Sequence, residues 1–250
     1  MMVLGRFALA GSAALLAGAV NAIAGGGSLI TFPALVAGGL PAVAASVTNT
    51  VAMTLAFVGA TAAQRRDLIG QRARLVRMLP VGAAGGVAGA LLLLHSGEAV
   101  FARIVPYLIL FAALLLAVQD RLRGWLLARV PGGHSEAWAI VPIGLASIYG
   151  GYFGAGMGVI VLAALGVVLG DSLIRLNAIK QAVSLACNLG AAVLFVFSDQ
   201  IDWPIAGVML VASLAGGTLG GLVSARIPPQ VLRGTVVTLA VVVAIVYLVK

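Results

Sequence analysis

The chain has 250 residues, of which 62% are hydrophobic and 9% are charged, and its formal net charge is +8. Soluble domains carry about 25% charged residues, so this composition excludes an ordinary soluble domain and indicates an all-α polytopic membrane protein whose main partner is the lipid bilayer. The basic residues lie in short gaps between apolar runs, without interleaved aromatic residues, which argues against a nucleic-acid partner.

Cysteine and histidine are too scarce for a disulfide framework or a metal site. The single cysteine, Cys187, lies within an apolar run, and neither histidine has a potential metal partner beside it in the sequence. An intramembrane hydrolase would need a nucleophile and a base inside the spans, and Ser28 has no histidine near it. We therefore expect no metal, no cofactor and no catalytic residue.

The first half of the chain begins with two unequal apolar arms separated by a run of glycines. Residues 4–24 are long enough to cross a bilayer, whereas residues 29–38 would rise only about 15 Å as a helix, half of the hydrocarbon core. Three full spans follow, with an arginine-rich loop after the first of them. We expect these spans at 42–63, 78–94 and 101–118 and the loop at 64–77.

The N-terminal arm has some features of a secretory signal peptide. Arg6 precedes an apolar core, and residues 22–24 read Ala-Ile-Ala, a candidate cleavage site. However, the apolar stretch continues directly to Leu40, and the second half repeats the arrangement. We therefore expect this arm to be retained in the mature protein.

The second half repeats the plan of the first after a polar segment. Arms are expected at 137–153 and 157–169, and full spans at 174–197, 203–223 and 231–249. In this repeat Gly25 and Gly27 correspond to Gly154 and Gly156, and Asn49 corresponds to Asn177. We predict a first transmembrane repeat at 1–120, a cytoplasmic linker at 121–136 and a second repeat at 137–250.

The distribution of basic residues favours one topology over another. If each broken element is a hairpin, twelve of the 15 basic residues face the cytoplasm; if each crosses fully, ten do. The positive-inside rule prefers the hairpins, but the alternative stays open because residues 4–24 could span alone. With hairpins, each half crosses the membrane three times, which is an odd number. The second repeat then starts on the opposite side of the membrane from the first, so the two repeats are inverted, which is a transporter architecture.

The two glycine-rich breaks are the candidate site. A broken helix leaves N–H and C=O groups that lipid cannot satisfy, so it survives only against protein or a water-filled cavity. The helix after each break would present unpaired N–H groups and the positive end of its dipole to an anion. By contrast, a second set of glycines has the spacing of helix–helix contacts: Gly85, Gly86, Gly89, Gly216, Gly217 and Gly220.

Lys180 is the most informative charge, because it lies inside the expected span at 174–197. Charges within spans usually face a cavity, where this one could bind an anion; the alternative is a lysine that snorkels to the cytoplasmic headgroups. Asparagines inside spans are costly unless they are paired. The predicted substrate-binding residues are Asn21, Gly25, Gly26, Gly27, Ser28, Asn49, Gly154, Gly156, Asn177, Lys180 and Asn188.

Several of these segments resemble one family over nearly the whole chain. Residues 21–35, Thr48-Asn49, residues 149–158, residues 176–180 and Asp202-Trp203 are similar to the TauE/SafE (sulfite exporter) family of membrane permeases. The resemblance implies a secondary transporter, usually an exporter, of sulfite, sulfonates or related small organic anions. One departure is Thr50, which stands where relatives often have lysine.

These observations together predict a transporter that binds a small anion between the two glycine breaks and moves it by alternating access. An anion channel is the alternative. We expect a multi-pass protein of the bacterial inner membrane, with a homo-oligomer as the one protein assembly to consider.

Overall fold

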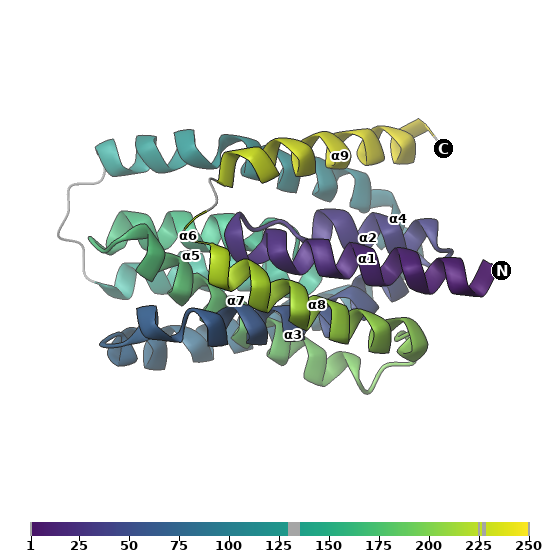
Figure 1. Cartoon of the computed structure of the whole chain (residues 1–250), viewed down its shortest axis with the longest axis horizontal. Coiled ribbons are helices and arrows are strands. Elements are labelled where there is room, and N and C mark those ends of the chain that lie inside the picture. The colour runs from purple at the N-terminus through teal and green to yellow at the C-terminus, as the bar shows by residue number, and fades with distance from the viewer. Residues whose placement is uncertain (1, 130–135, 225, 227–228, 250) are drawn as a thin grey trace.

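The computed structural model describes residues 2–129, 136–224, 226 and 229–249, and within these ranges the regular structure is helical throughout (Figure 1). The helices are α1 (Met2–Ile23), α2 (Ser28–Ala37), α3 (Ala42–Ala63), η1 (Arg65–Leu68), α4 (Arg72–Arg129), η2 (Glu136–Ala139), α5 (Ile140–Tyr152), α6 (Met157–Val168), α7 (Leu173–Phe195), α8 (Trp203–Val223) and α9 (Pro229–Val249). The prediction of an all-α protein is confirmed.

Five helical stretches of the described chain are long and apolar enough to cross a membrane. They are Leu4–Ile23, Ala42–Ala63, Arg72–Arg121, Leu173–Phe195 and Trp203–Val223. The helices α2, α5 and α6 are shorter, as expected for the segments beside the breaks. Length and composition therefore support a multi-pass membrane protein.

Both glycine-rich segments interrupt the helices where the sequence predicted. The chain leaves the helical conformation between Ile23 and Ser28, and again between Tyr152 and Met157. Four glycines in these gaps have φ between 80° and 86°: Gly25, Gly26, Gly154 and Gly156. Side chains oppose this left-handed region, which explains why the breaks are built from glycine.

The stretch labelled α4 contains two helices that meet at a kink. Gly97 at the kink is non-helical, with φ 69° and ψ 168°, so the spans predicted at 78–94 and 101–118 are two separate helices, as expected, and the second is longer than expected. The helix continues to Arg129, into the segment expected as a linker, and residues 130–135 of that linker lie outside the described residues. Residues 119–129 mix charged and apolar side chains, and most of them are good helix formers, so the charges alone do not end the helix.

Close helix packing follows the second set of glycines. Helix α8 packs along α1 and α3, and α4 packs along α5 and α7. A Cβ atom on Gly217 would collide with the backbone of Ala56, and one on Gly86 would collide with the backbone of Cys187. The other four positions, Gly85, Gly89, Gly216 and Gly220, face equally close neighbours, which confirms that these glycines are helix contacts.

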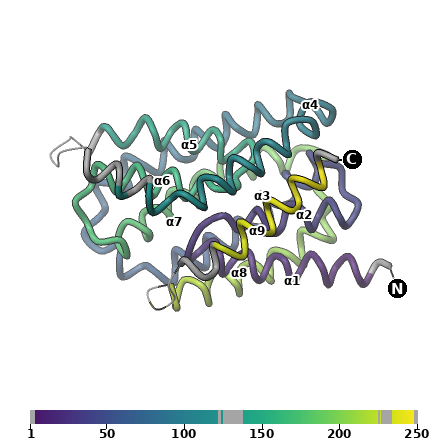
Figure 2. The backbone as a smooth tube through the Cα atoms, turned by 90° about the horizontal axis from the view of Figure 1, so that it is seen from above, coloured from purple at the N-terminus to yellow at the C-terminus, as the bar shows by residue number. Residues whose placement is uncertain are grey.

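The start of α1 and the end of α9 lie at the opposite end of the molecule from the end of α4 and the start of α5 (Figure 1). Helix α1 begins and α9 ends at the right of Figure 1, whereas α4 ends and α5 begins at the left. Seen from above, α1 and α9 again reach the same end (Figure 2). The helices therefore run roughly along one common axis.

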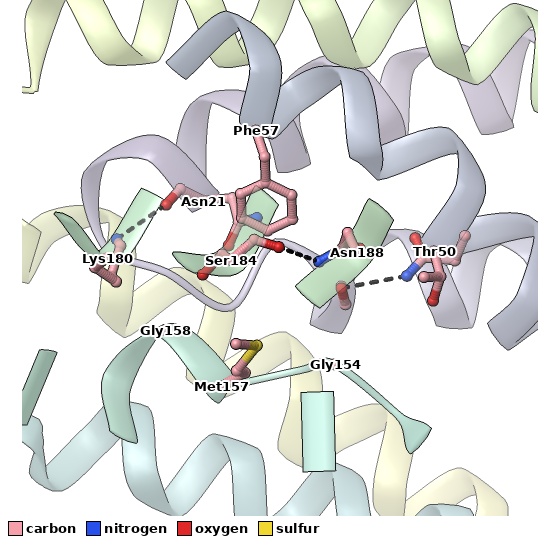
Figure 3. Close-up of a pocket in the computed structure, with 11 residues that line it drawn as sticks. Asn21, Thr50, Phe57, Gly154, Met157, Gly158, Lys180, Ser184 and Asn188 are labelled. Carbon is pink, nitrogen blue, oxygen red and sulfur yellow. Dashed lines mark hydrogen bonds between the residues drawn. The ribbon is translucent and has the colours of Figure 1, made fainter. Parts of the chain in front are cut away.

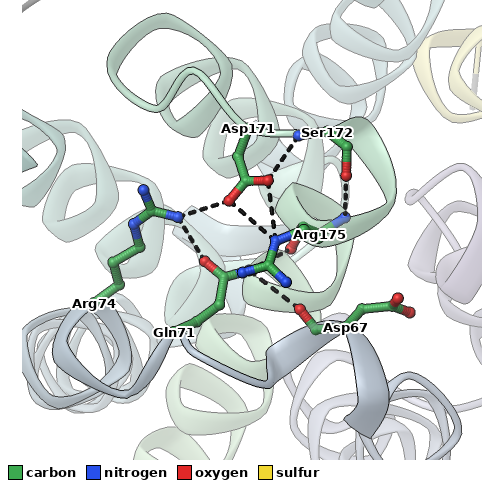
Figure 4. Close-up of polar contacts among 6 residues, drawn as sticks. All are labelled: Asp67, Gln71, Arg74, Asp171, Ser172 and Arg175. Carbon is green, nitrogen blue, oxygen red and sulfur yellow. Dashed lines mark hydrogen bonds and ion pairs between the residues drawn. The ribbon is translucent and has the colours of Figure 1, made fainter.

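A group of charged side chains joins the start of α4 to the start of α7 (Figure 4). Arg74 lies 2.8 Å from the carboxylate of Asp171, and Arg175 lies 3.0 Å from it. The backbone N–H of Ser172 donates to the same carboxylate at 2.8 Å. Although partial burial opposes it, these three donors hold the pKa of Asp171 below its ordinary value of 3.8.

We expect Gly217→Ala to destabilise the protein by about 1–3 kcal/mol, because the added Cβ would press against the backbone of α3. Gly207→Ala in the same helix is the matched control, since a Cβ there has nothing within 4 Å. Thermal unfolding of the purified protein in detergent measures the difference. A melting temperature for Gly217→Ala equal to that of Gly207→Ala would contradict close packing at this position.

We expect Asp171→Asn to lower the melting temperature at neutral pH and to have no effect in acid. Because the pKa of Asp171 is lower in the folded chain, its contribution is fully present above the unfolded pKa of about 4 and disappears as the pH falls through the folded value. Unfolding scans of both proteins between pH 7 and roughly pH 3 test this. Asp199→Asn, at an exposed position, is the control. A deficit that persisted in acid would show that charge is not the cause.

Candidate functional site

Polar side chains from distant parts of the chain converge on one small cavity (Figure 3). Its walls come from the end of α1, the starts of α2 and α6, and the middle of α3 and α7. The lining residues are Asn21, Ser28, Asn49, Thr50, Phe57, Gly154, Met157, Gly158, Lys180, Ser184 and Asn188. The cavity measures about 10 Å³, roughly what one ordered water needs, so a larger occupant requires the walls to move.

Lys180 is enclosed by protein. It is 2% exposed, and its Nζ donates to the carbonyl oxygen of Asn21 at 3.5 Å. Within the described ranges, no carboxylate forms an ion pair with it. The side chain therefore does not snorkel to the membrane surface in this structure, and a buried cation without a counter-charge fits an anion as its partner.

Two further side chains of α7 hold the broken end of α1. Gln181 Nε2 donates to the carbonyls of Asn21 and Ala22 at 3.2 and 3.0 Å. Asn177 Nδ2 donates to the carbonyl of Ala22 at 3.2 Å and to Gln64 Oε1 at 3.1 Å. The last carbonyls of a helix have no partner within the helix, so these amides replace the missing turn. They also fix the acceptor that faces Lys180.

Asn49 keeps unused hydrogen-bonding capacity beside the cavity. Its Nδ2 donates to Ser28 Oγ at 3.2 Å, but its Oδ1 is buried without a hydrogen-bond partner among the described residues. Leaving such an atom unpaired costs about 1–3 kcal/mol. Asn188, by contrast, donates to the backbone carbonyl of Ser184 at 2.9 Å. Asn49 therefore lines the cavity and keeps an acceptor oxygen that no described residue uses.

The starts of α2 and α6 both reach the cavity. Ser28 and Met157, the first residues of these helices, line it, and neither helix has a side chain that caps its first turn. A helix N-terminus carries a partial positive charge and outward-pointing N–H groups. The electrostatic field of both helix ends therefore favours a negative group.

The predicted site residues divide into two groups. Asn21, Ser28, Asn49, Gly154, Lys180 and Asn188 line the cavity, whereas Gly25, Gly26, Gly27, Gly156 and Asn177 lie outside its lining. A Cβ on Gly26 would meet Leu116, and one on Gly156 would meet Ala112, so both face α4 and not the cavity. Gly27 lies against the backbone carbonyl of Ala17. These glycines shape the breaks around the cavity.

The residues predicted from the sequence did not include several that line the cavity: Thr50, Phe57, Met157, Gly158 and Ser184. Helical spacing could have indicated Ser184, which is one turn beyond Lys180. Phe57 and Met157 carried no such signal, because an apolar residue in an apolar helix reads as core or lipid-facing. Gly158 packs on the stem of Lys180, where a Cβ would lie 3.3 Å from Lys180 Cδ.

The fold and the cavity define a helical membrane protein that encloses a polar, cationic site among its spans. Residues 10–247 match the sequence pattern of the family described as "Sulfite exporter TauE/SafE". The chain therefore belongs to the TauE/SafE family, and it is a membrane transporter of that family.

Curated relatives carry names that agree with this class. The chain is 27% identical to the probable membrane transporter protein YfcA of Escherichia coli, over 83% of this chain and 76% of the relative. It is 30% identical to a probable membrane transporter protein of Haemophilus influenzae, over 80% and 78%. It is 25% identical to the probable membrane transporter protein ORF9 of Sinorhizobium, over 93% and 88%. No solved structure matches the chain.

We expect Gln181→Leu to destabilise the protein by about 1–3 kcal/mol, because it removes two hydrogen bonds and leaves buried carbonyls of α1 with fewer donors. Thermal unfolding in detergent is the measurement. The matched control is Gln200→Leu, which changes an exposed glutamine in the same way. If the two variants had the same melting temperature, the hydrogen bonds of Gln181 to α1 would not contribute to stability.

Proposed function

We propose that the protein is a secondary transporter that exports a small anion, such as sulfite, a sulfonate or a related organic anion, across the bacterial inner membrane. The observation that carries this proposal is Lys180, a buried cation that has no carboxylate partner among the described residues and lies in a cavity beside two helix N-termini. In the bound state the ammonium would supply charge, and the positive ends of the α2 and α6 helix dipoles would orient the anion.

The size of the cavity supports alternating access. About 10 Å³ is too small for an anion of several heavy atoms, so the anion must bind in another arrangement of the helices. A protein that encloses its site between such arrangements moves a fixed number of ions per cycle. An anion channel would instead give flux without saturation, and the experiment below distinguishes the two.

The arrangement of helices supports two inverted repeats, each with a broken hairpin followed by three spans. Helix α1 and its counterpart α5 start from opposite ends of the molecule (Figure 1). The contacts correspond as well, because α1 packs on α8 of the second half while α5 packs on α4 of the first. Transporters with inverted repeats place substrate where the broken helices meet, as the cavity here does.

We expect purified protein in proteoliposomes to give saturable flux of sulfite or methanesulfonate, and Lys180→Met to weaken the affinity about ten- to a hundredfold. This is the loss of one charge-assisted hydrogen bond of about 1.5–3 kcal/mol. Arg103→Met is the matched control, because it removes a positive charge from an exposed position away from the cavity. Gel filtration and thermal unfolding establish that each variant is folded.

Three results would contradict the proposal in different ways. Flux that rises linearly with concentration would favour a channel. Unchanged affinity in Lys180→Met would show that this lysine does not contribute to anion binding. Absence of sulfite and sulfonate binding to the wild-type protein would exclude this class of substrate.

A further inference from the structure

We propose that Lys180 takes up a proton when the anion binds, so that the protein carries one proton with each monovalent anion. This inference rests on the proposed function and adds the coupling ion to it. Its basis is the number and direction of the protein polar groups that surround Lys180 Nζ in the cavity.

The protein groups around Lys180 Nζ suit a neutral amine better than an ammonium group. An ammonium group carries three N–H donors and no acceptor, whereas a neutral amine carries two donors and one lone pair. In the described structure Nζ has a single acceptor, the carbonyl of Asn21 at the long distance of 3.5 Å. That carbonyl already accepts a hydrogen bond from Gln181 at 3.2 Å. An ammonium group here would have two donors without a protein acceptor.

The helix ends around the cavity favour a positive charge only when an anion is present. The C-terminal end of α1, at Asn21, attracts a cation, but the N-terminal ends of α2 and α6 oppose it. An isolated charge in such an interior is costly, and proteins avoid it by neutralising the group. An anion placed between Lys180 and the two N-termini would reverse this balance for the ammonium form.

Neighbouring elements offer no other group of the described chain to take the proton within the cavity. Helices α3 and α6 carry no titratable side chain, and the one charged residue of α1, Arg6, is exposed at its far end. Titratable residues occur on η1, α4 and α5, but none lines the cavity. Those at the ends facing α7 are Arg65, Arg66, Asp67, Arg72, Arg74, Arg77, Tyr149 and Tyr152.

Several of these groups have partners elsewhere, and so do three groups on α7 or just before it. Arg74, Asp171 and Arg175 interact with one another. Tyr149 donates to the carbonyl of Ala155 at 2.7 Å, and Cys187 donates to the carbonyl of Ser147 at 3.3 Å. Lys180 is therefore the group positioned to take up a proton when the anion binds.

The transport cycle conserves both protons and charge. On the loading side, the neutral amine of Lys180 accepts one proton from water as the anion enters, and an ammonium–anion pair forms. On the release side, the anion leaves and the ammonium group returns its proton to water. One proton and one monovalent anion have crossed together, so no net charge has moved.

The test uses methanesulfonate, which remains a monovalent anion across the pH range of the experiment. Its affinity for the wild-type protein should weaken by about tenfold per pH unit as the pH rises, because one proton is bound with each anion. In a weakly buffered solution, a pH indicator should record uptake of one proton per anion bound. Flux into proteoliposomes should respond to a pH gradient and not to a membrane potential.

Two variants at the same position provide matched controls. Lys180→Arg keeps its charge at every accessible pH, so any binding it retains should be independent of pH and take up no proton. Lys180→Met lacks the titratable group, so its residual binding should also be independent of pH. Arg103→Met should keep the pH dependence of the wild-type protein.

The outcomes separate this inference from the proposed function. Binding could be saturable and require Lys180, yet show no pH dependence and no proton uptake. That result would overturn the proton inference but would still support the anion site. Flux driven by membrane potential would do the same. Equal binding by wild type and Lys180→Met would overturn both.

Discussion

The contact between Lys180 and the carbonyl of Asn21 depends on a helix that ends among buried residues. Helix α1 stops at Ile23, and the carbonyls of its last turn are turned toward α7. Because lipid could not satisfy these carbonyls, they must be covered by protein, and three polar side chains of α7 donate to them, those of Asn177, Lys180 and Gln181. The same arrangement that completes the helix therefore places a buried amine beside the cavity.

The two types of glycine in this protein solve different physical problems. Those at the breaks adopt positive φ, and they release the chain from the helix so that α2 and α6 can begin next to the cavity. Those on α4 and α8 are helical, and they let neighbouring backbones approach where any side chain would collide. Close packing of α1 on α8 and of α5 on α4 holds the broken helices in place, so the geometry of the cavity depends on both types.

Membership of the TauE/SafE family identifies the protein as a membrane transporter, and the cavity suggests how such a protein could bind its substrate. The side chain of Lys180 and the first residues of α2 and α6, Ser28 and Met157, lie around one small space. Phe57 and Met157 add an apolar wall, which would suit an anion that carries a small organic group. Substrate selection would then combine charge with size and polarity.

The sequence by itself determined the helical membrane class, the two breaks and the position of Lys180 inside a span. Composition requires lipid as the solvent, and glycine runs inside apolar stretches have few explanations other than a broken helix. It could not show that Gly26 and Gly156 face α4, or that Phe57 and Met157 line the cavity, because those facts depend on which face of each helix meets which neighbour. Nor could polarity show that α4 continues to Arg129, since good helix formers stay helical when they are polar. Tertiary structure decided these points, because contacts between distant segments, such as Gln181 with Asn21, have no signal in local spacing.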